Sequence, residues 1–230
     1  MATGYLLLEG GAEFGGAMSE PDREAIRLAG GPGAPVAILP TAAAPDNNQD
    51  RAGRNGSTWF RTLGATSVDV VPVIDHASAN DPALAERLRR SRLVYMLGGF
   101  PGHLADTLRG SLAWAAALQA YGDGAVLGGS SAGAMVLCEH YYDPEAAQVR
   151  PGLNVLGGTC LIPHHNGFGR AWSPRLLQAL PAATMLGIDE RTGILSDPRG
   201  SWTVYGSGQV TLYHGAASRT HRRGESFDLA

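Results

Sequence analysis

Short apolar runs, several of them ending in glycine, recur through the first half of the chain and constrain the fold more than any other feature. Most of the runs are apolar at consecutive positions, as in strands whose two faces are both buried in a parallel sheet. Segments with helical periodicity separate the runs, so strands and helices alternate. The sequence therefore predicts an α/β fold with a mainly parallel central sheet flanked by helices. The predicted strands are 5–8, 35–39, 68–73, 93–97 and 125–127.

The segments between these strands carry the start and stop signals of helices. One helix is predicted to begin at Ser19, with Pro21 in its first turn, and to end at Gly30-Gly31. A chain of 230 residues with 44% hydrophobic side chains has enough apolar material for one large core. We therefore expect a single α/β domain over residues 1–230. The other predicted helices are 46–63, 82–90, 102–109, 111–121 and 132–137.

In the second half of the chain the pattern changes to one in which strands prevail. Strands are predicted at 155–162 and 185–188. The runs 202–205 and 209–213 flank Gly206-Ser207-Gly208, a combination that predicts a β-hairpin. We expect these segments to extend the sheet with antiparallel strands toward the C-terminus.

Composition and charge exclude several chemistries. All 18 Lys+Arg residues are arginines, so the chain has no lysine for a Schiff base, a phosphate-binding P-loop or a Ser-Lys dyad. The formal net charge of −3 gives no general attraction to nucleic acid or to anionic membranes. No apolar run approaches the roughly 18 residues of a membrane helix, and the first residues lack a basic signal-peptide region. Together these features indicate a cytoplasmic protein.

The strongest local motif is Gly129-Ser130-Ser131-Ala132-Gly133, which fits the pattern G-x-S-x-G. It follows an apolar strand and opens an apolar helix. Small residues leave room for a sharp strand-to-helix turn, and such a turn exposes the central serine above the free N–H groups of the helix. The motif predicts that Ser131 is a nucleophile. The alternative is a tight packing turn without chemistry.

A serine nucleophile needs a base, and two of the seven histidines stand where catalytic groups collect. His164 and His165 come directly after the predicted strand that ends at Ile162. We predict His164 as the base and His165 as the second choice, because the other five histidines lie in predicted loops or helices. The alternative is a histidine that simply lies on the surface.

A carboxylate should orient the imidazole of the base. Glu139, Asp143 and Glu145 all lie between the serine and histidine motifs in the sequence. We favour Asp143 because it falls in a predicted loop after the helix and can fold back toward the imidazole. The alternative is that all three are ordinary charged side chains exposed to solvent.

Two N–H donors must stabilise the oxyanion that forms when a serine attacks a carbonyl. Ala132, directly after the predicted nucleophile, supplies one of them. Gly99 belongs to the Gly98-Gly99 pair at the end of a neighbouring strand and is predicted to supply the other. The alternative is that these glycines merely end the strand.

Five motifs follow one another in a characteristic order. They are Ile38–Thr41, Met96–Gly99, Gly129–Ala134, Pro163-His164 with Gly169-Arg170, and Gly187–Glu190. In this order they resemble the S51 peptidases, the family of dipeptidase E and cyanophycinase, over about residues 5–213. The resemblance implies a fold like that of class I glutamine amidotransferases, a Ser-His-Asp/Glu triad, and neither metal nor cofactor. It also implies that Ser131 is the nucleophile, His164 the base and Gly99 an oxyanion donor, and it leaves Asp143 and Glu145 open as the acid.

Two departures from the family pattern bear on the substrate. Where cyanophycinases continue Gly-Gly with Asp-Gln, this chain has Phe100-Pro101, and where they carry an arginine it has Phe168. The resemblance places Gly98, Phe100 and Phe168 in the substrate site, so these aromatic residues argue against cleavage of the Asp-Arg polymer. For Arg170 two interpretations stay open: an anchor for the carboxylate of an N-terminal Asp-X dipeptide, or a structural ion pair.

We therefore expect an S51-type serine peptidase that hydrolyses the amide bond of a small peptide through an acyl-enzyme. Its partner is that peptide, with no nucleic acid or membrane, and pairing as a homodimer stays open. One alternative is a catalytically silent ligand-binding or regulatory protein with the same fold. The other is an esterase of the α/β-hydrolase type, which is less favoured because its histidine usually stands much later in the chain than His164 does.

Overall fold

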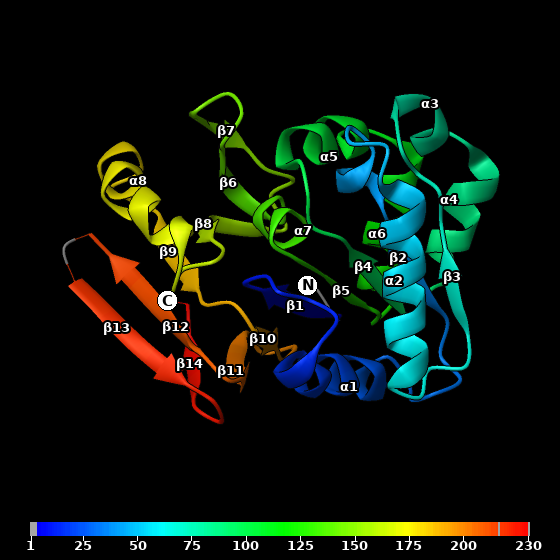
Figure 1. Cartoon of the computed structure of the whole chain (residues 1–230), viewed down its shortest axis with the longest axis horizontal. Helices are drawn as coiled ribbons and strands as arrows, with labels where there is room; N and C mark the ends of the chain where they lie inside the picture. The colour runs from blue at the N-terminus through cyan, green and yellow to red at the C-terminus, as the bar shows by residue number, and fades with distance from the viewer. Residues whose placement is uncertain (1–3, 216, 230) are drawn as a thin grey trace.

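The computed structural model describes residues 4–215 and 217–229, which form two β-sheets with helices packed around them (Figure 1). Five neighbouring strands of the larger sheet run parallel, and three strands on its other side are antiparallel to their neighbours. The predicted α/β fold with a mainly parallel central sheet is thereby confirmed. From edge to edge the eight strands are β14 (Ser226–Asp228), β11 (Ser201–Gly206), β10 (Thr192–Ser196), β1 (Tyr5–Glu9), β5 (Val126–Ser130), β4 (Leu93–Met96), β2 (Val36–Leu39) and β3 (Val68–Val70).

The second sheet is built mostly from the middle of the chain. Its six strands are, in order, β13 (Ala217–Arg222), β12 (Gln209–His214), β9 (Thr184–Ile188), β8 (Leu156–Ile162), β6 (Cys138–Asp143) and β7 (Gln148–Pro151). The central strand β8 runs parallel to both β6 and β9, whereas β7, β12 and β13 pair antiparallel. The chain thus leaves the larger sheet after β5, builds the parallel centre of the second sheet, and returns to the larger sheet at β10.

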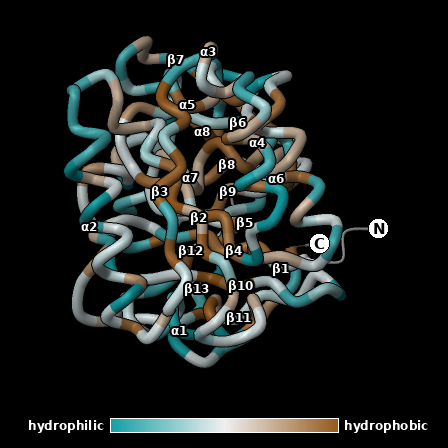
Figure 2. Tube along the Cα trace, turned by 90° about the vertical axis from the view of Figure 1, so that its right-hand side faces the viewer, coloured by the Kyte–Doolittle hydropathy of each residue, from teal (hydrophilic) through white to brown (hydrophobic). Residues whose placement is uncertain are grey.

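Helices cover both faces of the larger sheet because its strands are apolar on both faces. Along β1, Leu6 and Leu8 belong to one buried cluster and Leu7 to the other. Figure 2 shows the apolar stretches concentrated along central strands such as β2 and β4, with hydrophilic segments toward the periphery. No helix within the described ranges combines the length and the apolar character of a bilayer-spanning segment. The helices are α1 (Ser19–Leu28), α2 (Gln49–Thr62), α3 (His76–Ala79), α4 (Pro82–Arg89), α5 (Pro101–Leu108), α6 (Leu112–Gly122), α7 (Ala132–Met135) and α8 (Ser173–Ala179), with short 3-10 helices at Gly16–Met18, Thr41–Ala43 and Phe168–Trp172.

The helix predicted at 132–137 is wrong in its second half. Helix α7 ends at Met135, and the chain then extends into β6. Strand β6 is rich in aromatic residues, and its Tyr141 is fully buried, so pairing with β7 and β8 competes successfully with a longer helix. This difference moves Asp143 from a predicted loop to the end of a strand.

The predicted hairpin of 202–205 with 209–213 is also wrong. Strand β11 pairs with β10 and β14 in the larger sheet, whereas β12 pairs with β9 and β13 in the second sheet. At Gly206 the chain passes from one sheet to the other with a φ of 95°, and a Cβ there would lie 2.2 Å from the carbonyl oxygen of Arg191. Of the four strands predicted in the second half of the chain, one extends the larger sheet as β11, and the other three form β8, β9 and β12 of the second sheet.

Candidate active site

Ser131 occupies a tight turn between β5 and α7. Its backbone has φ 49° and ψ −114°, a conformation that side chains other than glycine adopt rarely, and its N–H donates to the carbonyl oxygen of Glu9 at 3.0 Å. A Cβ on Gly129 or on Gly133 would lie 2.4 or 2.2 Å from the carbonyl oxygen of Met96. The two flanking glycines therefore let the turn press against the end of β4, which holds the serine in place.

His164 lies within hydrogen-bonding distance of this serine. The Oγ of Ser131 is 3.1 Å from Nε2 of His164, which follows the end of β8. The N–H of His164 donates to the carbonyl oxygen of Gly10 at 2.7 Å, and a Cβ on Gly11 would lie only 2.2 Å from the imidazole Cε1. The glycines after β1 thus make room for the ring, and the structure brings together the serine and histidine that the sequence singled out.

The carboxylate beside the imidazole belongs to Glu190. Its Oε1 is 2.8 Å from Nδ1 of His164, and its own N–H donates to Oδ1 of Asn166 at 2.9 Å. Glu190 follows β9, the parallel neighbour of β8, so both side chains emerge at the same edge of the second sheet. The Glu190 side chain is 42% exposed and that of His164 is 17% exposed. Ser131 therefore comes from the larger sheet, and its two hydrogen-bonded partners come from the second sheet.

Asp143, the acid that the sequence favours, lies elsewhere in the structure. Asp143 ends β6 and is buried, with Oδ2 paired to Nη1 of Arg150 at 3.1 Å. Its Oδ1 accepts the N–H groups of Glu145 and Ala146 in the turn to β7. The carboxylate is thus fully engaged in holding the β6–β7 turn and does not contact His164.

Glu139, Glu145 and His165 lie away from the serine as well. Glu145 is exposed in the β6–β7 turn, and Glu139 accepts the N–H of Gly158 at 2.6 Å. His165 is buried, with Nε2 2.9 Å from the hydroxyl of Tyr213, and burial lowers the pKa of its imidazole. His165 is therefore a core histidine of the second sheet.

Gly98, Gly99 and Phe100 follow β4 and line a cavity beside the serine. A Cβ on Gly98 would lie 3.4 Å from the Cβ of Ser131, so this glycine is adjacent to the turn. Gly99 has a φ of 139°, and a Cβ there would lie 2.2 Å from the carbonyl oxygen of Ala42. Ala132 opens α7, where the first N–H groups have no acceptor within the helix. The cavity has a volume of about 450 Å³, and its lining includes Glu13, Asp46, Asn48, Arg51, Gly98 and Phe100.

Comparison with known proteins identifies the family. A sequence profile of peptidase family S51 matches residues 6–198. The chain belongs to peptidase family S51. A cyanophycinase from Synechococcus elongatus is 30% identical over 197 residues, a stretch that covers 80% of this chain and 60% of that protein. The S51 chain thus spans only about 60% of the length of this relative.

Two solved structures resemble the S51 chain. A peptidase from an acI-B1 actinobacterium gives a TM-score of 0.89 at 28% identity, with 99% of this chain and 97% of that chain covered. A structure described as a peptidase E protein from Listeria monocytogenes EGD-e gives a TM-score of 0.63 at 17% identity, with 96% and 99% covered. At that identity the second likeness concerns the fold alone. The predicted resemblance to the S51 family is confirmed, and so is the predicted fold.

The two other predicted substrate residues of the S51 chain lie after His164. The Phe168 ring stacks on the His164 imidazole with centroids 4.6 Å apart and an interplanar angle of 28°, and its side chain is exposed. Arg170 is also exposed and has no ion pair in the part of the chain that the structure describes. The interpretation of Arg170 as a structural ion pair therefore finds no partner among these residues.

A buried pair of acids, Glu9 and Asp22, lies next to the serine turn of the S51 chain. Both side chains are fully buried, and burial raises the pKa of Asp22 to about 7 and that of Glu9 well above its usual range. The Tyr95 hydroxyl donates to Glu9 Oε2 at 2.5 Å, and the Trp59 indole donates to Asp22 Oδ2 at 2.7 Å. Two carboxylates cannot both be charged in such a site, so the pair holds a proton at neutral pH.

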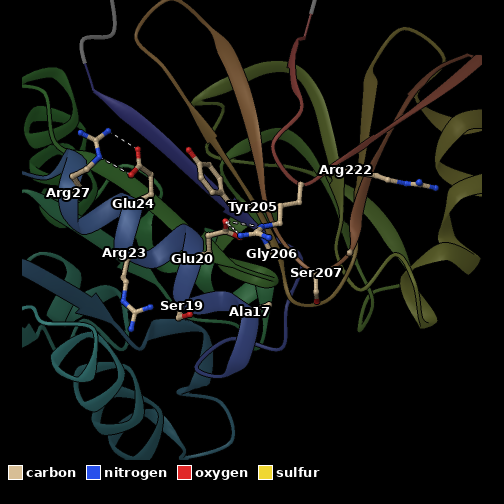
Figure 3. Close-up of a pocket in the computed structure, with 12 residues that line it drawn as sticks. Ala17, Ser19, Glu20, Arg23, Glu24, Arg27, Tyr205, Gly206, Ser207 and Arg222 are labelled. Carbon is tan, nitrogen blue, oxygen red and sulfur yellow. Dashed lines mark hydrogen bonds and ion pairs between the residues drawn. The ribbon is translucent and has the colours of Figure 1, made fainter.

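Another groove of the S51 chain lies away from the serine. Its volume is about 1020 Å³, and it runs along α1 beside the turn from β11 to β12 (Figure 3). Its ion pairs join Arg27 to Glu24 at 2.7 Å and Arg223 to Glu20 at 2.8 Å. Glu20 also accepts the N–H of Gly206 at 3.0 Å. Glu20 thus ties α1 to the C-terminal turns, whereas the pair of Arg27 and Glu24 lies within α1. The groove shares no lining residue with the cavity beside the serine.

Proposed function

We propose that this S51 chain is a serine peptidase that hydrolyses an amide bond of a short peptide, with Ser131 as nucleophile, His164 as base and Glu190 as the orienting acid. The hydrogen-bonded series from Ser131 Oγ to His164 Nε2 at 3.1 Å, and from His164 Nδ1 to Glu190 Oε1 at 2.8 Å, carries this proposal. Glu190 accepts the Nδ1–H bond and so leaves Nε2 free to accept the serine proton.

In the first half of the reaction, Ser131 Oγ attacks the carbonyl carbon of the peptide while its proton passes to His164 Nε2. The carbonyl oxygen becomes an oxyanion, which the N–H groups of Gly99 and Ala132 stabilise. The resulting imidazolium, paired with the Glu190 carboxylate, then gives its proton to the leaving amine. The C–N bond breaks, and an ester to Ser131 is left behind.

In the second half of the reaction, water replaces the departed amine. His164 takes a proton from this water, whose oxygen attacks the ester carbonyl and forms the oxyanion again. The proton then returns from His164 to Ser131 Oγ as the C–O bond breaks. The products are the free acid and the regenerated enzyme.

The cavity beside Gly98 favours a short peptide as substrate. A volume of about 450 Å³ accommodates a residue or two of extended chain, not a folded protein. The relatives at 30% identity are named cyanophycinases, but Phe100 and Phe168 replace polar residues of the pattern that cyanophycinases share, which argues against the Asp-Arg polymer. Arg170, exposed and unpaired among the described residues, is the cation that an N-terminal Asp-X dipeptide would require.

A fluorophosphonate probe tests this function, because it reacts with an activated serine hydroxyl and not with an ordinary one. We expect stoichiometric labelling of the wild type, no labelling of Ser131→Ala, and unchanged labelling of the control Ser207→Ala, whose serine lies in an exposed turn. Absence of labelling in the wild type would instead identify a catalytically silent member of the fold.

A further inference from the structure

We infer that Glu13 binds a positively charged group of the substrate directly beside Ser131, and that this group is the free N-terminal ammonium of the peptide. This inference rests on the proposed function, because it takes Ser131 as the attacking group. It assigns the specificity for a free N-terminus to one carboxylate in the loop after β1.

The position of Gly98 shows how close this carboxylate lies to the serine. A Cβ built on Gly98 would lie 3.3 Å from Oε1 of Glu13 and 3.4 Å from the Cβ of Ser131. Oε1 of Glu13 and Cβ of Ser131 therefore lie on the same side of Gly98, less than about 7 Å apart, and glycine puts no side chain between them. A small cation bound to this carboxylate beside Gly98 stands next to the serine.

Glu13 is free to bind such a cation. Its Oε2 accepts the hydroxyl of Ser130 at 2.9 Å, which orients the carboxylate, and no arginine or histidine of the described residues forms an ion pair with it. Arg51 lines the same cavity, but its Nε donates to Oδ1 of Asn48 at 2.7 Å. The cavity thus presents a carboxylate near the serine, and this carboxylate forms no ion pair with any arginine or histidine of the described residues.

The loop that carries Glu13 is fixed in place. Ala12 and Phe14, on either side of it, have φ values of 58° and 66°, which side chains adopt only where the surroundings enforce it. The Phe14 ring packs against Trp59 and Tyr95, with centroids 6.4 and 6.1 Å apart. A carboxylate held by such a loop needs little reordering when it binds an ion.

The covalent geometry of a peptide identifies the cation. In an amino acid residue the α-nitrogen lies about 2.5 Å from the carbonyl carbon, so an N-terminal ammonium stays beside a carbonyl that Ser131 attacks. The ammonium of a lysine side chain lies about 6 Å from its own Cα, much farther from the scissile carbonyl than the α-nitrogen does. The site therefore fits a peptide whose first residue carries the scissile carbonyl, and the enzyme removes one residue from the N-terminus.

A set of X-Ala dipeptides, in which X is each common amino acid, tests this inference by mass spectrometry. The best dipeptide is then compared with its N-acetyl form in the wild type, in Glu13→Gln and in the matched control Glu145→Gln, whose side chain is exposed in a distant turn. We expect Glu13→Gln to lower kcat/KM for the free dipeptide by about 10- to 100-fold, mainly through KM, because a charge-assisted contact is lost. The control should retain the wild-type preference for the free amine.

Fluorophosphonate labelling separates this inference from the proposed function. If the wild type is not labelled, the peptidase assignment itself fails. If wild type and Glu13→Gln are both labelled but discriminate equally between free and N-acetylated dipeptides, Glu13 is not the anchor. If N-acetyl-Lys-Ala or N-acetyl-Arg-Ala is cleaved in a Glu13-dependent way, the carboxylate binds a side chain and the assignment of the N-terminal ammonium is overturned.

Discussion

Two acid-containing hydrogen-bond networks meet at Ser131, and they differ in their access to water. In one, the hydroxyl of Ser131 contacts His164, which contacts Glu190, and the carboxylate is 42% exposed. In the other, the N–H of Ser131 donates to the backbone of Glu9, whose side chain is fully buried against Asp22. Burial holds a proton on the pair in the second network, whereas the carboxylate of the first network is open to solvent. The two glutamates therefore differ in burial and not in residue type.

The largest expected effect comes from the exposed network. In Glu190→Gln the side-chain amide can donate to Nδ1 of His164, which moves the ring proton to Nε2 and blocks the acceptor that the serine needs. We expect kcat/KM on the best dipeptide to fall by about 10²- to 10⁴-fold with little change in KM. Stopped assays of hydrolysis by mass spectrometry measure this loss.

Asp143→Asn is the matched control for this prediction. It removes the carboxylate that pairs with Arg150. We expect kcat/KM to stay within about threefold of the wild type, because losing an ion pair that does not contact the serine or the histidine lowers the free energy of unfolding and not the rate of the reaction. An equal loss of activity in both variants would contradict the assignment of Glu190 as the orienting acid.

The second-largest expected effect concerns the buried pair of Glu9 and Asp22 and is a change in the free energy of unfolding. Because burial raises the pKa of Asp22 to about 7, the folded state keeps a proton that the unfolded chain releases above about pH 4. The free energy of unfolding therefore falls as pH rises from about 4 to 7, by on the order of 2–4 kcal/mol from this pair. In Asp22→Asn the amide remains an acceptor for Trp59 and has no proton to lose, so this part of the decline should disappear.

Urea unfolding across this pH range measures the difference between variant and wild type. The difference should grow in favour of Asp22→Asn as pH rises, whereas Glu24→Gln, at an exposed ion pair of the same helix, should show no such trend. Parallel pH curves for Asp22→Asn and the wild type would mean that Asp22 does not titrate in this range.

The smallest effect is expected for Phe168, which contacts His164 in the exposed network. Phe168→Ala removes the ring that stacks on His164, and stacked aromatic pairs contribute about 0.5–1.5 kcal/mol. We expect kcat/KM to fall by about 2- to 10-fold, with labelling by fluorophosphonate slowed but complete. A loss as large as that of Glu190→Gln would show that Phe168 does more than restrict the imidazole.

The sequence predicts those parts of the site that depend on local chain geometry. Small residues around Ser131 predict a crowded turn, and the position of His164 after an apolar run places it at a strand end. Both features are set by residues close in the sequence. The five parallel strands follow from the same kind of signal, because consecutive apolar residues need burial on both faces.

The sequence does not single out the acid, because its identity depends on which strands become neighbours. Glu190 is the second residue after the predicted strand 185–188, as His164 is after Ile162, so the strand-end signal that selects His164 applies to it too. Only the parallel pairing of β8 and β9 brings the two residues together. The loop expected around Asp143 does not form, since aromatic residues between α7 and Asp143 pair as β6. Likewise, the residues around Gly206 are typical of a hairpin turn. The two flanking strands do not pair with each other, because β11 pairs with β10 and β12 pairs with β9.

The division of the reacting groups between two sheets has a consequence for biosynthesis. A ribosome releases Ser131 well before His164 and Glu190, and folding tends to begin with the segments that emerge first. β1 can pair with β10 only after residues 192–196 have been made. In a growing chain Ser131 therefore stands without His164 and Glu190 until the strands that carry these two residues have been made.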